Sequence, residues 1–251
     1  MESNFNSKIL LIADYGRSGQ GWLSYMLSYI LNAAYIEPYN FLVGKRYTAS
    51  DYVINLTQGD LVDREKTKYS LIVKTHNYPS ENFNLPKKVL FLIRDPRDVA
   101  VSMHNLHLIH EKSVGWNHPR AKISLLFEKY FKIFDYISTI SQWQRYFYAY
   151  KKVNHFLVRY ENLNKNAENE LSKILDYLDC ADQEKYIKEA VEKFSFEKIT
   201  GRKQGQEDKN STEFRKGIVG DYKNKMSKFE IYVINKLFKK VLKDSGYEVN
   251  G

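Results

Sequence analysis

The segment from Ile9 to Leu31 constrains the fold of this chain more than any other stretch of the sequence. It opens on an apolar run of strand length, Ile9–Ile12, and continues through a turn that contains Gly16, Gly19 and Gly21. Apolar residues then recur at three- and four-residue spacing, as on one face of a helix: Trp22, Leu23, Met26, Leu27, Ile30 and Leu31. Such a strand, turn and helix N-terminus predict an anion cradle, because glycine lets the backbone approach an anion and the first helical N–H groups point at it.

The turn differs from the phosphate loop of nucleoside-triphosphate-binding proteins, G-x-x-x-x-G-K-[ST]. The spacing from Gly16 to Gly21 matches, and Arg17 supplies a positive charge. Trp22 and Leu23, however, stand where that loop carries its lysine and its magnesium-binding hydroxyl. We therefore predict a phosphate-binding loop without a metal. For this segment alone, an ordinary strand–turn–helix unit with no ligand is the alternative.

Strand-length apolar runs alternate with helical patterns along the rest of the chain. The further strands are expected at Leu71–Val73, Val89–Ile93 and Phe156–Val158. This alternation predicts an α/β fold with a mainly parallel central sheet flanked by helices and joined by right-handed crossovers. We find no repeat or linker, so one domain is expected over residues 1–251, with its motifs between residues 8 and 230. The stretch from Tyr35 to Tyr69 allows no assignment.

Single residues predict several boundaries between these elements. Pro96 suits the first turn of a helix, and Asp95 is expected to cap it. The pattern of that helix breaks between Glu111 and Arg120, and a long helix is expected from Ile123 to Tyr150. A last helix is expected to begin after Ser227, its cap. The polar segment from Thr200 to Thr212 is expected to be a mobile loop.

Charge and cysteine content limit the class of function. The net charge of +9 fits an anionic ligand, a nucleic acid or a membrane surface. The basic residues are scattered, however, and no Lys/Arg run resembles a nucleic-acid-binding tail. Cys180 is the only cysteine, so no internal disulfide forms and a reducing compartment is allowed. There is no secretory signal pattern and no run of about 18 apolar residues. We expect a cytoplasmic protein with no membrane span and no nucleic-acid partner.

Side chains that can contact an anion follow three of the expected strands. Arg17 follows the first, Lys74 and His76 the second, and Arg94 the third. Ligands of parallel α/β sheets bind beyond the carboxyl ends of the strands, so these side chains are expected to converge. Lys74 and His76 lie two residues apart and share a side of an extended chain, which places a cation beside a candidate base. A purely structural histidine is the alternative.

Two later segments also have anion-binding patterns. In Arg94–Ser102 an arginine closes a buried strand and a serine lies two turns into the next helix, where both can face one phosphate. The alternative is an Arg94–Asp98 surface pair with an incidental serine. In Arg215–Asn224 two adjacent cations lie in a glycine-containing loop, which predicts a clamp over an anion. A solvated basic loop is the alternative there.

Together and in this order, these four segments resemble the motifs of the soluble sulfotransferase family, from residue 8 to about residue 230. The resemblance implies transfer of a sulfuryl group from 3′-phosphoadenosine-5′-phosphosulfate (PAPS) to an acceptor hydroxyl or amine. The product of the donor would be 3′-phosphoadenosine-5′-phosphate (PAP). It also implies a P-loop-like fold, no metal, and a small-molecule or glycan acceptor.

The resemblance assigns roles to individual residues. The cradle of the 5′-phosphosulfate would consist of Arg17, Ser18, Gly19, Gln20 and Gly21. The adenine side would be lined by Trp22, Tyr160 and Phe196. The 3′-phosphate would be held by Arg94 and Ser102, with Arg215, Lys216 and Gly217 closing on it. His76 would be the general base, with Lys74 and Arg17 stabilising charge on the transferring group.

The sequence also departs from the family pattern. Arg17 stands where lysine is frequent, and Gln20 and Gly21 stand where two threonines are common. Lys228 and Tyr232 replace valine and glutamate of the family's short dimer motif, so the oligomeric state stays open.

Three other functions remain possible on the sequence. They are a protein that holds the nucleotide without transferring sulfate, a small-molecule kinase, and a basic nucleic-acid binder. Intact Lys74 and His76 argue against the first, and the Trp22–Leu23 pair argues against the second. His104, His107 and His110 recur every three residues, but no cysteine or carboxylate cluster supports them as metal ligands.

Overall fold

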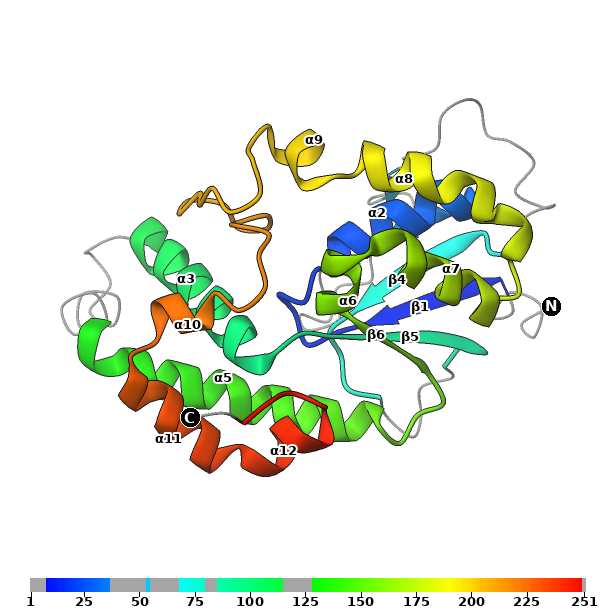
Figure 1. Ribbon diagram of the computed structural model, residues 1–251. Helices are drawn as coiled ribbons and strands as arrows, with labels where there is room; N and C mark the ends of the chain where they lie inside the picture. The colour runs from blue at the N-terminus through cyan, green and yellow to red at the C-terminus, as the bar shows by residue number, and fades with distance from the viewer. Residues whose placement is uncertain (1–7, 37–52, 55–67, 80–84, 115–127, 250–251) are drawn as a thin grey trace. The chain divides into compact units, whose positions relative to one another are not determined.

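The computed structural model describes residues 8–36, 53–54, 68–79, 85–114 and 128–249 (Figure 1). The chain divides into two compact units, and each is described by itself. Unit 1 comprises Met1–Ile93 and Ala149–Gly201, and unit 2 comprises Arg94–Tyr148 and Arg202–Gly251.

Unit 1 is built on a six-stranded sheet in the order β3-β2-β4-β1-β5-β6. The strands are β1 (Ile9–Ala13), β2 (Ala34–Ile36), β3 (Val53–Ile54), β4 (Leu71–Thr75), β5 (Lys88–Ile93) and β6 (Phe156–Arg159). All neighbours pair in parallel except β3, which runs antiparallel to β2. The predicted mainly parallel α/β sheet is confirmed, and so are its four predicted strands. β2 and β3 are additions, and both fall at or within the stretch that allowed no assignment.

The helices of unit 1 cover a continuous apolar core. They are α2 (Gln20–Leu31), α6 (Tyr160–Lys165), α7 (Ala167–Tyr177), the 3₁₀-helix η3 (Ala181–Tyr186), α8 (Ile187–Lys193) and α9 (Phe196–Thr200). Figure 1 shows α2, α7 and α8 over the same face of the sheet. The core joins strand residues such as Leu10 and Leu90 to Met26 of α2 and Ile174 of α7, all with no exposed surface. Each of these burials contributes about 1.5–3 kcal/mol, and this core holds the loop after β1 in place.

The register of β1 against β4 determines what meets at the edge of the sheet. Ala13 lies opposite Thr75, the last residues of the two strands. The backbone N–H of Asp14 donates to the carbonyl of Thr75 at 3.2 Å. Because the strands are parallel and end together, the residues that follow them emerge side by side. Lys74 lies inside β4 and not after it, which corrects the expected end of this strand at Val73.

Unit 2 is helical. It contains α3 (Pro96–Val114), most of α5 (Glu128–Tyr150), α10 (Tyr222–Lys225), α11 (Lys228–Leu237) and α12 (Lys239–Asp244). Polar contacts join these helices: Arg97 of α3 donates to Asn235 of α11 at 3.0 Å, and Tyr148 of α5 donates to Asp244 of α12 at 2.8 Å. Trp143 and Phe147 stack within α5 at 5.3 Å between ring centroids.

The helix caps of unit 2 are those predicted from the sequence, whereas some of its helix ends differ from the prediction. The Arg97 backbone N–H donates to Asp95 at 2.9 Å, which confirms the cap of α3. Ser227 caps α11 and forms a capping box with Glu230. The expected single last helix is wrong, because it divides into α11 and α12 at Phe238. α3 continues to Val114, past the expected break.

Other expectations lie partly outside the described residues. The long helix begins by Glu128, but its expected start at Ile123 lies in the part that the structure does not describe. The segment after Thr200 contains neither helix nor strand up to Asp221. It is tied by the Arg202 guanidinium, which donates to the carbonyls of Phe214 and Arg215 at 2.6 and 3.0 Å. Its mobility stays a prediction.

Candidate active site

The loop between β1 and α2 has the backbone geometry of an anion cradle. Gly16, Arg17 and Gly19 all have positive φ angles, of 110°, 62° and 90°. Gly19 is the N-cap of α2, and no side chain caps the helix. A helix start of this kind directs its first N–H groups and the positive end of its dipole toward a ligand.

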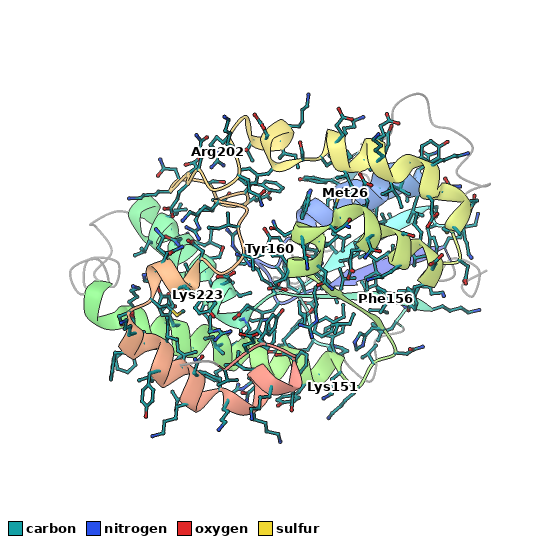
Figure 2. All side chains as sticks on the ribbon, viewed as in Figure 1. Met26, Lys151, Phe156, Tyr160, Arg202 and Lys223 are labelled. Carbon is teal, nitrogen blue, oxygen red and sulfur yellow. The ribbon has the colours of Figure 1, made fainter. Side chains whose placement is uncertain are left out.

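Tyr160, which directly follows β6 and is labelled in Figure 2, packs against Gly19 of this loop. A methyl group added at Gly19 would lie only 2.6 Å from the Tyr160 ring, so only glycine allows this approach. Trp22 meets the same ring edge to face at 6.3 Å, and its indole N–H donates to the carbonyl of Phe194 at 2.7 Å. Phe196 begins α9 shortly after this carbonyl. The three aromatic residues assigned to the adenine side therefore all belong to unit 1.

The side chains inside the loop are mostly engaged in holding it. Gln20 is 3% exposed, and its amide donates to the carbonyl of Ile12 at 2.5 Å. The Ser18 hydroxyl donates to the carbonyl of Gly16, and the Ser18 backbone N–H donates to the Asp14 carboxylate, both at 3.4 Å. The Gln20 side chain thus ties α2 to β1.

His76 lies immediately beyond β4, against the end of β1. Its Nδ1 atom lies 2.8 Å from the Asp14 carboxylate and 3.0 Å from the Asp14 carbonyl. The Asp14 side chain is completely buried, whereas the His76 side chain is 46% exposed. Burial and nearby Lys74 lower the pKa of His76. The charge of Asp14 and the hydrogen bonds with it raise this pKa by more, so the net shift is upward from the ordinary value of 6.5. The sequence pattern gave Asp14 no role, although its place one residue after a strand was a usable signal.

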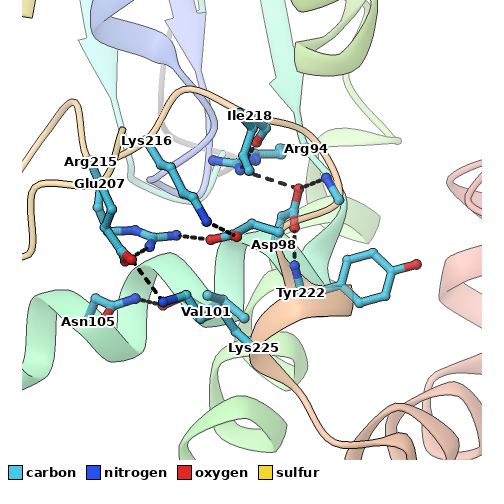
Figure 3. Close-up of polar contacts among 12 residues, drawn as sticks. Arg94, Asp98, Val101, Asn105, Glu207, Arg215, Lys216, Ile218, Tyr222 and Lys225 are labelled. Carbon is cyan, nitrogen blue, oxygen red and sulfur yellow. Dashed lines mark hydrogen bonds and ion pairs between the residues drawn. The ribbon is translucent and has the colours of Figure 1, made fainter. Parts of the chain in front are cut away.

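In unit 2, Asp98 organises the loop that carries the predicted clamp (Figure 3). Its carboxylate accepts from the backbone N–H groups of Gly220 and Tyr222 at 2.7 and 2.9 Å, and from Arg94 at 3.3 Å. Arg94 also donates to the carbonyl of Ile218 at 2.9 Å. Burial raises the pKa of Asp98, and its partners offset only part of this effect. The Arg94–Asp98 pair therefore exists, but it is buried and not on the surface.

Arg215 and Lys216 are held by carboxylates. Arg215 is 6% exposed and donates to Asp221 at 2.6 Å and to Glu207 (Figure 3). Lys216 reaches the other oxygen of Asp221 at 2.7 Å. Burial opposes ionisation of Asp221, but the two cations outweigh it and hold its pKa below the usual value. Because Arg215 is buried and doubly paired, a solvated basic loop does not describe this segment. Gly217 has a φ of 69°.

The predicted site residues divide between the two units. Unit 1 holds the loop, Lys74, His76, Tyr160 and Phe196, while unit 2 holds Arg94, Ser102 and Arg215 to Gly217. Ser102 lies on α3 and is 5% exposed. Within unit 1, His76 meets Asp14, a residue outside the predicted set, at the ends of β4 and β1, and the predicted convergence of Arg17, Lys74, His76 and Arg94 stays a prediction.

Two of the three histidines at three-residue spacing pair with a carboxylate of α5. His104 and His107 contact the same carboxylate, Asp135, through Nδ1 at 2.7 and 3.0 Å. Burial opposes ionisation of Asp135, but these hydrogen bonds outweigh it and lower its pKa. Among the residues that the structure describes, no three potential ligands gather to hold a metal ion. Nor is any helix in those ranges long and apolar enough to cross a membrane.

Comparison with known proteins identifies the family of the chain. The family model of the sulfotransferase domain matches residues 7–246. The chain belongs to the sulfotransferase family. The resemblance predicted from the residue motifs is therefore confirmed, as is a PAPS-dependent sulfotransferase at the level of the family.

Relatives and solved structures are similar along nearly the whole chain. Mouse sulfotransferase 1B1 is 26% identical over 95% of this chain and 84% of its own length. Cytosolic sulfotransferase 16 of Arabidopsis thaliana is 24% identical over 94% of this chain and 76% of its own. Retinol dehydratase, solved with retinol and PAP, has a TM-score of 0.60 at 18% identity and covers 96% of this chain and 83% of its own. This structural similarity shows that the fold is shared.

Proposed function

We propose that this sulfotransferase transfers the sulfuryl group of PAPS to a hydroxyl of a small-molecule or glycan acceptor, with His76 as the general base. The observation that carries the proposal is the contact of His76 Nδ1 with Asp14, 2.8 Å away, beside the uncapped start of α2. A base and an anion cradle lie at the ends of the neighbouring strands β4 and β1. Group transfer from an anionic donor to a hydroxyl needs both.

The cradle fits an anionic donor. Its three positive φ angles turn backbone toward the loop interior, and the tight approach of Gly19 to Tyr160 leaves no room for a side chain. The donor supplies an activated sulfuryl group and a phosphate leaving group. Arg17, Lys74 and the N–H groups at the start of α2 would meet the charge that develops on the leaving oxygens, as preorganised donors do in group transfer. The same groups supply a positive field without a metal.

The chain's other residues would bind and orient the donor. Trp22, Tyr160 and Phe196 would line the adenine side in unit 1. In unit 2, Arg94 and Ser102 would hold the 3′-phosphate, and Arg215, Lys216 and Gly217 would contribute from the loop that Asp98 organises. The solved structures with PAP support this assignment of the nucleotide, although they are under 25% identical.

His76 would take the proton of the acceptor hydroxyl. A hydroxyl is a poor nucleophile until that proton leaves, and an imidazole is suited to accept it near neutral pH. The acceptor oxygen then bonds to sulfur while the bond from sulfur to the leaving phosphate oxygen breaks. A cytoplasmic location is part of the proposal, by similarity to the cytosolic sulfotransferase of Arabidopsis thaliana, and the single cysteine allows it.

A transfer assay tests the proposal. PAPS labelled with ³⁵S is incubated with a panel of phenol, sterol, sugar and amine acceptors, and wild type is compared with His76→Ala and Asp135→Asn. We expect His76→Ala to lose about 10²–10⁴ in kcat with PAP affinity unchanged within a few fold. Asp135→Asn, which alters a histidine contact in unit 2, should keep its activity. Normal turnover by His76→Ala would reject His76 as the base.

A further inference from the structure

We infer that Asp14 is a positioning residue that holds His76 in the tautomer protonated on Nδ1 and so presents Nε2 to the acceptor. The inference rests on the proposed function and extends it to a residue that the sequence motifs leave without a role. It depends on the described contacts at the ends of β1 and β4.

The tautomer follows from the two partners of one nitrogen. Nδ1 hydrogen-bonds to the carbonyl of Asp14 at 3.0 Å, and the Oδ1 atom of the Asp14 carboxylate lies 2.8 Å from it as a charge contact without hydrogen-bond geometry. A carbonyl can only accept hydrogen bonds, so Nδ1 must carry the proton, and the nearby carboxylate oxygen favours the same placement. In the neutral ring, Nε2 then carries the lone pair. Within the described part of the chain no residue bonds Nε2, and the side chain is 46% exposed.

Two hydrogen bonds and complete burial of the side chain fix the position of Asp14. Its backbone N–H donates to the carbonyl of Thr75 at 3.2 Å, which joins the ends of β1 and β4. Its second carboxylate oxygen accepts from the Ser18 backbone N–H at 3.4 Å. Its side chain has no exposed surface. A carboxylate fixed in this way gives the imidazole a defined orientation, which a partner on a mobile chain could not do.

Without His76, a carboxylate at the position of Asp14 would be unfavourable for binding an anion. It is a buried carboxylate in a loop whose backbone and Arg17 favour anions, so on its own it would weaken donor binding. The contact with His76 places a positively charged or polar partner beside this carboxylate. Among the described residues, the charged groups that face His76 are Asp14, from the end of β1, and Lys74, from β4, and they act in opposite directions on its protonation.

The pair also stabilises the reaction's protonated state. When Nε2 accepts the proton from the acceptor hydroxyl, the ring becomes an imidazolium. Its Nδ1–H stays on Asp14, whose negative charge offsets the new positive charge, and Asp14 does not take the proton. The acceptor oxygen forms its bond to sulfur, and the leaving phosphate oxygen departs with the electron pair of the broken bond.

Asp14→Asn is the test, because it keeps the size of the side chain and removes its charge. Asp135→Asn is the matched control, since it removes a carboxylate that contacts His104 and His107 instead. In protein labelled with ¹⁵N-histidine, the His76 resonances are assigned by their loss in His76→Ala. We expect wild-type His76 to be protonated on Nδ1 when neutral. We also expect its pKa to fall in Asp14→Asn and to stay unchanged in Asp135→Asn.

Kinetics supply the second readout. Asp14→Asn should lower kcat by at least about tenfold, but by no more than His76→Ala, for which about 10²–10⁴ is expected. The acid limb of its kcat profile should move to lower pH. The double variant should be no slower than His76→Ala alone, because residues that act as one unit are not additive.

The inference and the proposed function fail in different ways. A wild-type protein that transfers no label to any acceptor rejects the proposed function, whatever the spectra show. Active wild type with an unchanged Asp14→Asn profile rejects the inference alone. So does an Nε2-protonated His76, or a double variant whose losses multiply.

Discussion

Replacing Gly19 by alanine should destabilise the loop through two separable effects. Gly19 has a φ of 90°, and an L-residue held in the left-handed region costs about 1–2 kcal/mol. The new methyl group would lie 2.6 and 2.8 Å from two carbons of the buried Tyr160 ring, and overpacking of this kind costs about 1–3 kcal/mol. We therefore expect Gly19→Ala to lower the free energy of unfolding by about 2–5 kcal/mol.

Gly21→Ala is the matched control for this change. Gly21 lies two residues further along, within α2, and a methyl group there would meet nothing within 4 Å. Alanine is favoured over glycine in a helix by up to about 1 kcal/mol, so this variant should be as stable as wild type or more so. The assay is urea unfolding followed by circular dichroism. In thermal unfolding, Gly19→Ala should lower Tm by about 4–20 °C, at roughly 2–4 °C per kcal/mol.

A double-mutant cycle separates the two effects. In Gly19→Ala/Tyr160→Ala the ring is gone, so only the backbone strain of the alanine substituted for Gly19 remains. We expect a coupling energy of about 1–3 kcal/mol that favours the double variant over the sum of the single losses. Equal stability of Gly19→Ala and Gly21→Ala would refute the argument. Additive losses in the cycle would show that the ring does not limit the loop.

Three further predictions concern the ligand and the pH dependence. Arg94→Ala should weaken PAP binding by about tenfold to a hundredfold, because a charge-assisted contact contributes about 1.5–3 kcal/mol. Adenosine 5′-phosphosulfate, which lacks the 3′-phosphate, should bind almost as before. Equal losses of affinity for the two ligands in calorimetry would mean that Arg94 only supports Asp98. PAP binding should be unchanged by a chelator, since Leu23 replaces the magnesium-binding hydroxyl, and binding only with Mg²⁺ would favour a kinase. The lowered pKa of Asp135 contributes stability that is present above its ordinary value of 3.8 and lost as pH falls through the folded value. Asp135→Asn should therefore be less stable at neutral pH and lose less stability on acidification, as measured by urea unfolding at several pH values.

Local signals in the sequence were sufficient for most of the framework. The β1 and β5 runs, the helical spacing of α2 and the caps at Asp95 and Ser227 each depend on residues within a few positions of one another. Short-range spacing and capping chemistry decide these features, so they are predictable without the fold. The motifs at Arg17, His76 and Arg94 were likewise sufficient to identify the family.

Short and irregular segments were less predictable. β2 and β3 have three and two residues, too few to show a period, and their pairing with each other and with β4 comes from the sheet. The break between α11 and α12 also has no proline or glycine to mark it. In both cases packing outweighs a weak local preference.

The partners of the charged residues were decided only by the tertiary structure. Asp14 and His76 are 62 positions apart and meet because β1 and β4 are parallel neighbours in one particular register. Asp98 is 124 positions from the N–H of Tyr222 that it accepts, a contact made within unit 2. Hydrogen bonds and ion pairs act over a few ångströms, so they depend on distance in space, which no spacing along the sequence specifies. The sequence determined which chemical groups the site would contain, and the fold decided which of them face each other.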